Sequence, residues 1–193
     1  SPVYGPFFGA TTDEGRTLVD VPLIEEDGYY TMDFEGFERE LEKTGAKLLI
    51  LCNPHNPVGR AWTEDELRRI GDICLRHNVV VVADEIDADF ARAGHVHVPY
   101  ASLGERYAKS AVVCTAPSKT FNLAGLIGSY HIIYNKRLKD RVLKESSLCH
   151  YNSMNVLSMH ALMGAYTPEG QEWVGELREV IGENVAYACD YID

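Results

Sequence analysis

The chain has 193 residues, 46% of them hydrophobic and 24% charged, which is typical of a folded globular domain and argues against disorder. Its 18 basic and 29 acidic residues give a net charge of −11, which argues against nucleic acid as a partner because phosphates require clustered lysines and arginines. No apolar run is long enough to cross a bilayer, so we expect no membrane association.

The apolar pattern predicts strands that alternate with helices. Strands are expected at 17–24, 47–52, 79–83, 110–114 and 128–134, and helices at 33–43, at 63–78 and through most of the chain after residue 136. Thr63 and Glu66 form a capping-box pattern at the start of the second helix. Continuous apolar runs such as VVVVA are typical of parallel strands that are covered on both faces. The sequence therefore predicts an α/β fold, a three-layer α/β/α arrangement around a mostly parallel sheet.

Three polar segments each follow the end of a predicted strand. They are NPHNPVG at 53–59, DEIDAD at 84–89 and SKTFN at 118–122. In open α/β sheets, ligands bind beyond the carboxyl ends of the strands. We therefore expect Asn56, Asp84 and Lys119 to lie on one edge of the sheet.

Lys119 is the candidate with the most specific chemistry. A desolvated lysine has a lowered pKa and can attack an aldehyde to form a Schiff base. The hydroxyls of Thr115 and Ser118 could donate hydrogen bonds to a phosphate. The alternative is an ordinary exposed lysine in a polar loop, because most lysines are exposed.

Asp84 and Asn56 have two interpretations each. A carboxylate at the end of a valine strand is costly to bury unless a cation, such as a pyridinium nitrogen, pairs with it. The alternative is that Asp84 caps a helix or binds an arginine. The amide of Asn56 could donate to a phenolic oxygen, or the doubled Asn-Pro could simply be a rigid connection.

The ordered motifs resemble those of one family. NPHNPVG, ADEI and SKTFNLAGL, in this order, resemble the fold-type I pyridoxal-phosphate (PLP) enzymes of the aminotransferase class I/II family. Within that family the chain is most similar to the carbon–sulfur lyases of the cystathionine β-lyase type. The segments that carry this likeness are PVY at 2–4, PFF at 6–8, YTMDF at 30–34 and APSKTFNLAGL at 116–126.

The resemblance implies a role for each matching residue. Lys119 would hold PLP as a Schiff base and later move the α-proton of the substrate. Asp84 would pair with the pyridine nitrogen, and Asn56 would hydrogen-bond the 3-oxygen of the ring. Tyr4 would stack on the cofactor, and Ser118 would contact its phosphate. The family also implies a homodimer.

Two positions depart from the common pattern of aminotransferases. Asp87 stands among the expected cofactor contacts where many aminotransferases have Tyr and most lyase-like members have His. A second carboxylate near Asp84 would raise one of the two pKa values, and an ionised Asp87 cannot donate a hydrogen bond. Ile127 stands where aminotransferases carry a phosphate-binding Arg, and the lyase-like branch often lacks that Arg too.

The expected activity is β-elimination of sulfur from an amino acid such as cystathionine or cysteine, giving a thiol, pyruvate and ammonia. An aminotransferase on the same scaffold is the first alternative, and a non-catalytic PLP-fold domain that binds a partner or regulates is the second. The resemblance also implies that residues 1–193 are the central part of the PLP-binding large domain, with an N-terminal segment and a small C-terminal domain outside it.

The metal-ligating residue types are not spaced for a metal site. The five cysteines are scattered without the CxxC spacing of zinc sites. The group Asp87, Asp89, His95 and His97 also lacks a zinc-like spacing. We therefore expect no metal, free thiols and a cytoplasmic protein, since disulfides persist mainly in oxidising compartments.

Overall fold

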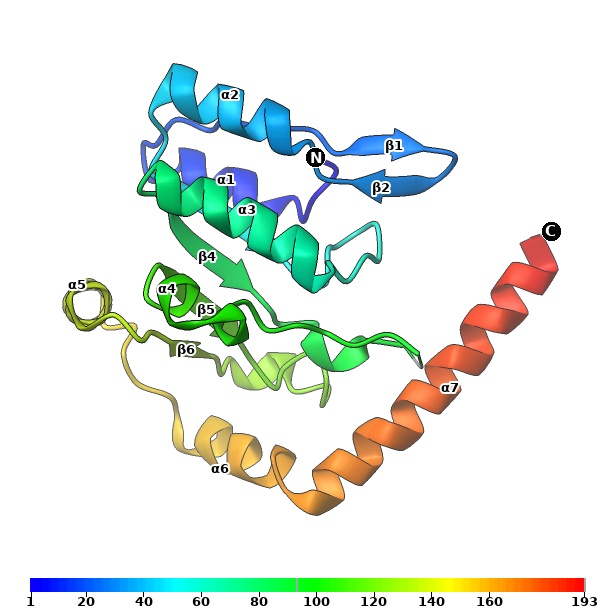
Figure 1. The fold of residues 1–193 in the computed structure, drawn as a ribbon. Helices are drawn as coiled ribbons and strands as arrows, with labels where there is room; N and C mark the ends of the chain where they lie inside the picture. Colours follow the sequence, from blue (N-terminus) through cyan, green and yellow to red (C-terminus); the bar gives the residue numbers. More distant parts are fainter. Residues whose placement is uncertain (93, 193) are drawn as a thin grey trace.

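A four-stranded sheet forms the centre of the molecule (Figure 1). The structure is a computed structural model and describes residues 1–92 and 94–192. Strands β3 (Leu48–Cys52), β4 (Val80–Asp84) and β5 (Ala111–Thr115) are parallel, and β6 (Tyr130–Ile132) is antiparallel to β5. The predicted α/β class with a mostly parallel sheet is therefore confirmed.

Helices and short turns between the strands cover one face of the sheet. Helix α3 (Glu64–Arg76) connects β3 to β4, and the 3-10 turn η2 (Tyr100–Leu103) and helix α4 (Glu105–Ala108) precede β5. Figure 1 shows α3 and α4 in front of the strands that they contact. The largest buried side chains of this layer are Trp62, Leu67, Val81, Tyr100 and Tyr107. Burial of these side chains is the main source of stability, at roughly 25 cal/mol per Å² of apolar surface.

The helix ends follow the sequence signals. Helix α2 (Phe34–Thr44) begins after Asp33, whose carboxylate accepts a hydrogen bond from Gly36 N at 2.8 Å, and it ends at Gly45, where φ is 68°. At the start of α3, Thr63 N donates to the Glu66 carboxylate at 2.8 Å, and Glu66 N donates to Thr63 Oγ1 at 3.3 Å. The predicted capping box is thus confirmed.

The strand predicted at 17–24 is wrong for all but its last residue. Residues 17–23 have no regular structure, and β1 (Ile24–Glu26) pairs instead with β2 (Tyr29–Thr31) in a separate hairpin. Asp27 and Gly28, with φ values of 52° and 79°, form its two-residue turn. Asp-Gly is a strong signal for such a turn, whereas Pro22 disfavours a continuous strand because it has no N–H to donate.

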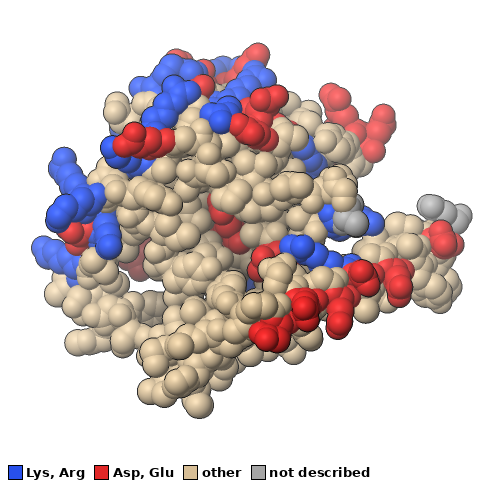
Figure 2. All heavy atoms as spheres, turned by 60° about the horizontal axis from the view of Figure 1, so that its bottom comes forward, with Lys and Arg blue, Asp and Glu red and all other residues tan. Residues whose placement is uncertain are grey.

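The C-terminal part is helical, as predicted. Helix α5 (Lys136–Leu148) follows β6, and α6 (Val156–Ala165) leads into α7 (Pro168–Ile192), which projects away from the sheet (Figure 1). Figure 2 shows acidic side chains along this projecting helix, where Glu172, Glu176 and Glu179 are exposed. The short helix α1 (Pro6–Thr12) lies near the N-terminus. Among the described residues, no helix is both long enough and apolar enough to span a membrane.

Candidate functional site

The carboxyl ends of the three parallel strands meet at one level. Cys52 of β3 is paired in register with Asp84 of β4, and Asp84 is paired with Cys114 of β5. Beyond these residues, Asn53 N donates to Asp84 O and Glu85 N donates to Cys114 O, each at 2.9 Å. The segments that begin at Asn53 and Asp84 therefore start side by side at one edge of the sheet, and the third segment begins at Ser118, three residues after β5 ends at this edge.

Asp84, Asp87 and Lys119 share one electrostatic environment at this edge. Burial raises the pKa of Asp84, the nearby charges of Asp87 and Glu85 raise it further, and the charge of Lys119 opposes them. Burial likewise raises the pKa of Asp87, again opposed by Lys119. The expected influence of a second carboxylate on the pKa of Asp84 is thus present. Two half-buried carboxyls near one ammonium group leave room for a further cation.

The loop that carries Asn56 is held against the same edge. Fully buried Asn53 donates to Val98 O at 3.1 Å and accepts from Trp62 N at 3.1 Å. Asn56 N donates to the Cys52 sulfur at 3.4 Å. Burial raises the pKa of Cys52 to about 11, with contributions from the charges of Asp84 and Asp87. The side chain of Asn56 is exposed beside this buried, neutral thiol.

The segment that contains Tyr4 is hydrogen-bonded to the loop that carries Asn56. His55 Nε2 donates to Pro2 O at 2.8 Å, two residues before Tyr4. The Tyr4 ring packs edge-on against Phe7 with 5.4 Å between the ring centroids, and 42% of Tyr4 is exposed. The structure therefore brings the Tyr4 segment to the Asn56 loop and leaves a large part of the ring accessible.

Lys119 lies in a loop whose other residues are largely inside the protein. Ala116, Pro117 and Thr120 are buried, and Thr115 and Ser118 are half-buried, whereas Lys119 is exposed. Its side chain is therefore accessible rather than desolvated, as in the alternative interpretation of an exposed lysine. Its proximity to two carboxyls with raised pKa values distinguishes it from an ordinary surface lysine.

The sequence did not indicate a buried polar contact next to Asp84. Glu85 Oε1 accepts from Tyr100 N at 2.7 Å, and Glu85 Oε2 lies 3.2 Å from His97 Nε2. The side chains of Glu85 and His97 are only 6% and 9% exposed. His97 is one of the four residues considered for a metal, and its Nε2 atom is hydrogen-bonded to Glu85. Within residues 1–92 and 94–192, no cluster of three or more His, Cys, Asp or Glu residues could hold a metal ion.

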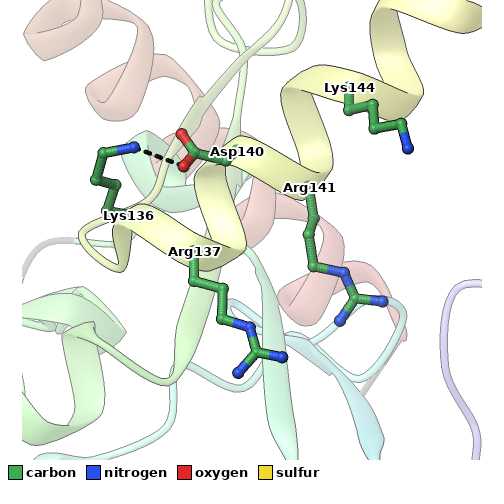
Figure 3. A pocket seen from close by; sticks show the side chains of 5 residues that line it. All are labelled: Lys136, Arg137, Asp140, Arg141 and Lys144. Carbon is green, nitrogen blue, oxygen red and sulfur yellow. Dashed lines mark hydrogen bonds and ion pairs between the residues drawn. The ribbon is translucent and has the colours of Figure 1, made fainter.

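A basic hollow lies elsewhere on the surface, on α5. Its lining consists of Lys136, Arg137, Asp140, Arg141 and Lys144 (Figure 3). Asp140 pairs with Lys136 at 2.6 Å. All the lining residues belong to one helix, and none comes from the three polar segments. The hollow is therefore separate from the candidate site at the strand ends.

Curated proteins of known activity are similar to this chain over nearly its whole length. Cystathionine β-lyase PatB of Bacillus subtilis is 41% identical over 184 residues, which cover 95% of the chain and 47% of the relative. The chain thus spans about half the length of the curated relatives it matches.

Solved structures with similar backbones bind PLP. Cystalysin from Treponema denticola, which contains a pyridoxal 5′-phosphate cofactor, superposes with a TM-score of 0.95 at 37% identity, over 99% of this chain and 48% of its own. The PLP-bound C–S lyase from Staphylococcus hominis has a TM-score of 0.91 at 36% identity, over 100% and 48% of the two chains. The family model for aminotransferase class I and II matches residues 1–192. The chain belongs to the aminotransferase class I and II family.

Proposed function

We propose that the chain is the central part of the PLP-binding domain of a carbon–sulfur β-lyase, in which Lys119 holds the cofactor. The observation that carries the proposal is the grouping of Lys119 with Asp84 at the strand ends, in a chain that is similar to cystathionine β-lyases and to PLP-bound C–S lyases. Such a lyase releases a thiol, pyruvate and ammonia from cystathionine or cysteine.

The chemistry of the side chains at this edge suits PLP. An accessible lysine amine can bind an aldehyde carbon. The half-buried carboxyl of Asp84 has a raised pKa and would gain from a cationic partner, which a protonated pyridine nitrogen supplies. The hydroxyls of Thr115 and Ser118 suit the phosphate.

Each residue would have one task in the reaction. When bound, PLP withdraws electrons from the α-carbon of the substrate. Asp84 would keep the pyridine nitrogen protonated, and Asn56 would donate its amide to the ring oxygen. Lys119 Nζ would take the α-proton from the substrate and then return a proton. Tyr4 would cover one face of the ring, which excludes water from it.

The role of Asp87 follows from its charge. Its carboxyl lies near Asp84 and Lys119. When ionised, Asp87 adds a second negative charge that favours the protonated pyridine nitrogen. When protonated, it can also donate a hydrogen bond to the ring oxygen. We propose that Asp87 contacts the cofactor in the position that a neutral donor occupies in related enzymes.

A test with and without a 2-oxo acid separates lyase from aminotransferase activity. The full-length protein is incubated with cystathionine or cysteine, and thiol and pyruvate are measured. We expect both products to form at equal rates without any 2-oxo acid, and Lys119→Ala to form neither. Turnover that requires a 2-oxo acid acceptor would contradict the lyase proposal and identify an aminotransferase.

We propose a cytoplasmic homodimer as the working form. The five cysteines are all free thiols, which is typical of a reducing compartment. Helix α6 exposes apolar side chains, including Val156, Leu157 and Met163. Apolar surface of this kind is typical of a helix that another surface covers. A second copy of the chain is the proposed partner.

A further inference from the structure

A partly buried hydrogen bond connects Thr120, the residue after Lys119, to the carboxylate of Asp89. Thr120 is 1% exposed, and its Oγ1 donates to Asp89 Oδ2 at 2.9 Å. Asp89 lies in η1 (Ala88–Phe90), directly after Asp87 and Ala88. The hydrogen bond therefore joins the Lys119 loop to the segment that carries Asp87, across 31 residues of sequence.

Helix α7 contacts both of the segments that this hydrogen bond joins. Arg178 of α7 donates through Nε to the backbone oxygen of Asp89. Phe121, two residues after Lys119, stacks on Trp173 of α7 with 5.8 Å between centroids and 24° between the ring planes. Both contacts attach this part of α7 to the loop residues that flank the candidate site.

Backbone hydrogen bonds within the Lys119 loop hold it in a turn. Phe121 N donates to Pro117 O, and Leu123 N donates to Ser118 O, each at 2.9 Å, so the loop is one compact turn. Lys119 lies inside this turn with its side chain exposed. The side-chain hydrogen bond of Thr120 to Asp89 therefore joins this turn to the segment that carries Asp84 and Asp87, alongside the stacking of Phe121 on Trp173.

We propose that Asp89 is a positioning residue that sets the location of the Lys119 amine through Thr120. The inference rests on the proposed function of Lys119, and it adds a residue that touches neither cofactor nor substrate. The hydrogen bond from Thr120 Oγ1 to Asp89 Oδ2 restrains the turn from outside. Losing it would let the turn move and lower the fraction of Lys119 that meets the cofactor in a reactive geometry.

The test compares the parent protein with four single variants at Asp89 and Thr120, with the Asp89→Ala/Thr120→Val double variant and with one control. Asp89→Ala removes the acceptor and Thr120→Val removes the donor, whereas Asp89→Asn and Thr120→Ser each retain one hydrogen-bonding oxygen. Exposed Glu179→Ala, next to Arg178 on α7, is the matched control. Each protein is titrated with PLP, reduced with borohydride and digested, and the adduct on the Lys119 peptide is quantified.

We expect Asp89→Ala and Thr120→Val each to raise the PLP concentration for half-maximal labelling about tenfold, which corresponds to about 1.4 kcal/mol. The double variant should be no worse than either single variant, because both remove one interaction. For three variants the PLP concentration for half-maximal labelling should stay within about threefold of the parent value. These are Thr120→Ser, Asp89→Asn and Glu179→Ala. If position 89 or 120 tolerated no substitution at all, Asp89→Asn and Thr120→Ser would also lose labelling, so near-parent labelling in these two variants excludes a general loss of folding.

Hydrogen exchange provides a second readout that needs no cofactor. In Asp89→Ala and Thr120→Val, the amides of Phe121 and Leu123 should exchange at least about fivefold faster, because opening of the turn becomes easier. Unchanged labelling and exchange in both variants would overturn the positioning role, as would additive effects in the double variant. If the parent itself shows no adduct on Lys119, the proposed function fails, while faster exchange would still support the link between Asp89 and the turn.

Discussion

Asp84→Asn is expected to stabilise the cofactor-free chain and to lower the turnover of the full-length protein about 100-fold. Burial raises the pKa of Asp84 above its ordinary value of 3.8, so ionising this carboxyl opposes folding. In the holoenzyme the same charge would pair with the pyridine nitrogen. Removing one member of such a pair costs about 3 kcal/mol, which is about 100-fold in rate.

The stability effect of Asp84→Asn depends on pH in a defined direction. Below about pH 3.8 the carboxyl is protonated in both the folded and the unfolded chain, so parent and variant should be equally stable. As the pH rises, the unfolded chain loses its proton before the folded chain does, and the parent loses stability until the raised pKa is passed. Asparagine does not ionise and avoids this loss.

Urea unfolding at several pH values measures this difference. Because water screens a half-buried carboxyl, we expect a gain of only about 0.5 kcal/mol for Asp84→Asn at neutral pH. If the variant is as stable as the parent at neutral pH, or less stable, then ionising Asp84 does not destabilise the folded chain. Asp13→Asn, at an exposed position, is the control and should show no change.

Glu85→Ala is expected to lower the free energy of unfolding by about 3 kcal/mol. The change leaves Tyr100 N and His97 Nε2 without their carboxylate partner in a nearly solvent-free place. Leaving a buried hydrogen-bond donor without its partner typically costs about 1–3 kcal/mol, and Glu85→Ala does this to two donors. The measurement is urea unfolding of the chain at neutral pH.

A conservative change at the same position separates the hydrogen bonds from the packing. Glu85→Gln retains an acceptor oxygen for Tyr100 N and should lose less than about half as much. Glu179→Ala, on the exposed face of α7, should stay within about 0.5 kcal/mol of the parent. A loss below about 1 kcal/mol for Glu85→Ala would mean that the Glu85 contacts contribute little to stability.

The sheet and its helices could be predicted because their signals are local. The valine run of β4 and the Thr63–Glu66 capping box need only neighbouring residues to be interpreted. The hairpin of β1 and β2 was missed because each strand has only three residues, too few for an alternating pattern to be recognised. The Asp27-Gly28 turn was the available signal.

The candidate site was predictable only in outline. The order of the three polar segments after three strands predicts a common edge, because parallel strands end on the same side. The contacts that hold this edge together depend on how loops return to the sheet. Glu85 meets His97 across 12 residues, and Asp89 meets Thr120 across 31. No local pattern encodes those paths.

The resemblance of motifs supplied the chemical roles, and the structure adds their physical setting. Asp87 illustrates the difference. Its position in the motif predicted an unusual second carboxylate, and the structure shows a half-buried group whose pKa is raised near Lys119. The exposure of Lys119 was open from the sequence, where a desolvated and a surface lysine were both consistent with the pattern.

The mass of the chain after reaction with PLP and borohydride tests the central claim most directly. The parent, Lys119→Ala and Lys119→Arg are treated in parallel, and Lys109→Ala, an exposed lysine paired with Glu105, is the matched control. We predict one pyridoxyl-phosphate adduct on the parent and on Lys109→Ala, and none on either Lys119 variant. An equal adduct on the parent and on Lys119→Ala, or no adduct on the parent, would contradict the assignment of Lys119 as the residue that holds the cofactor.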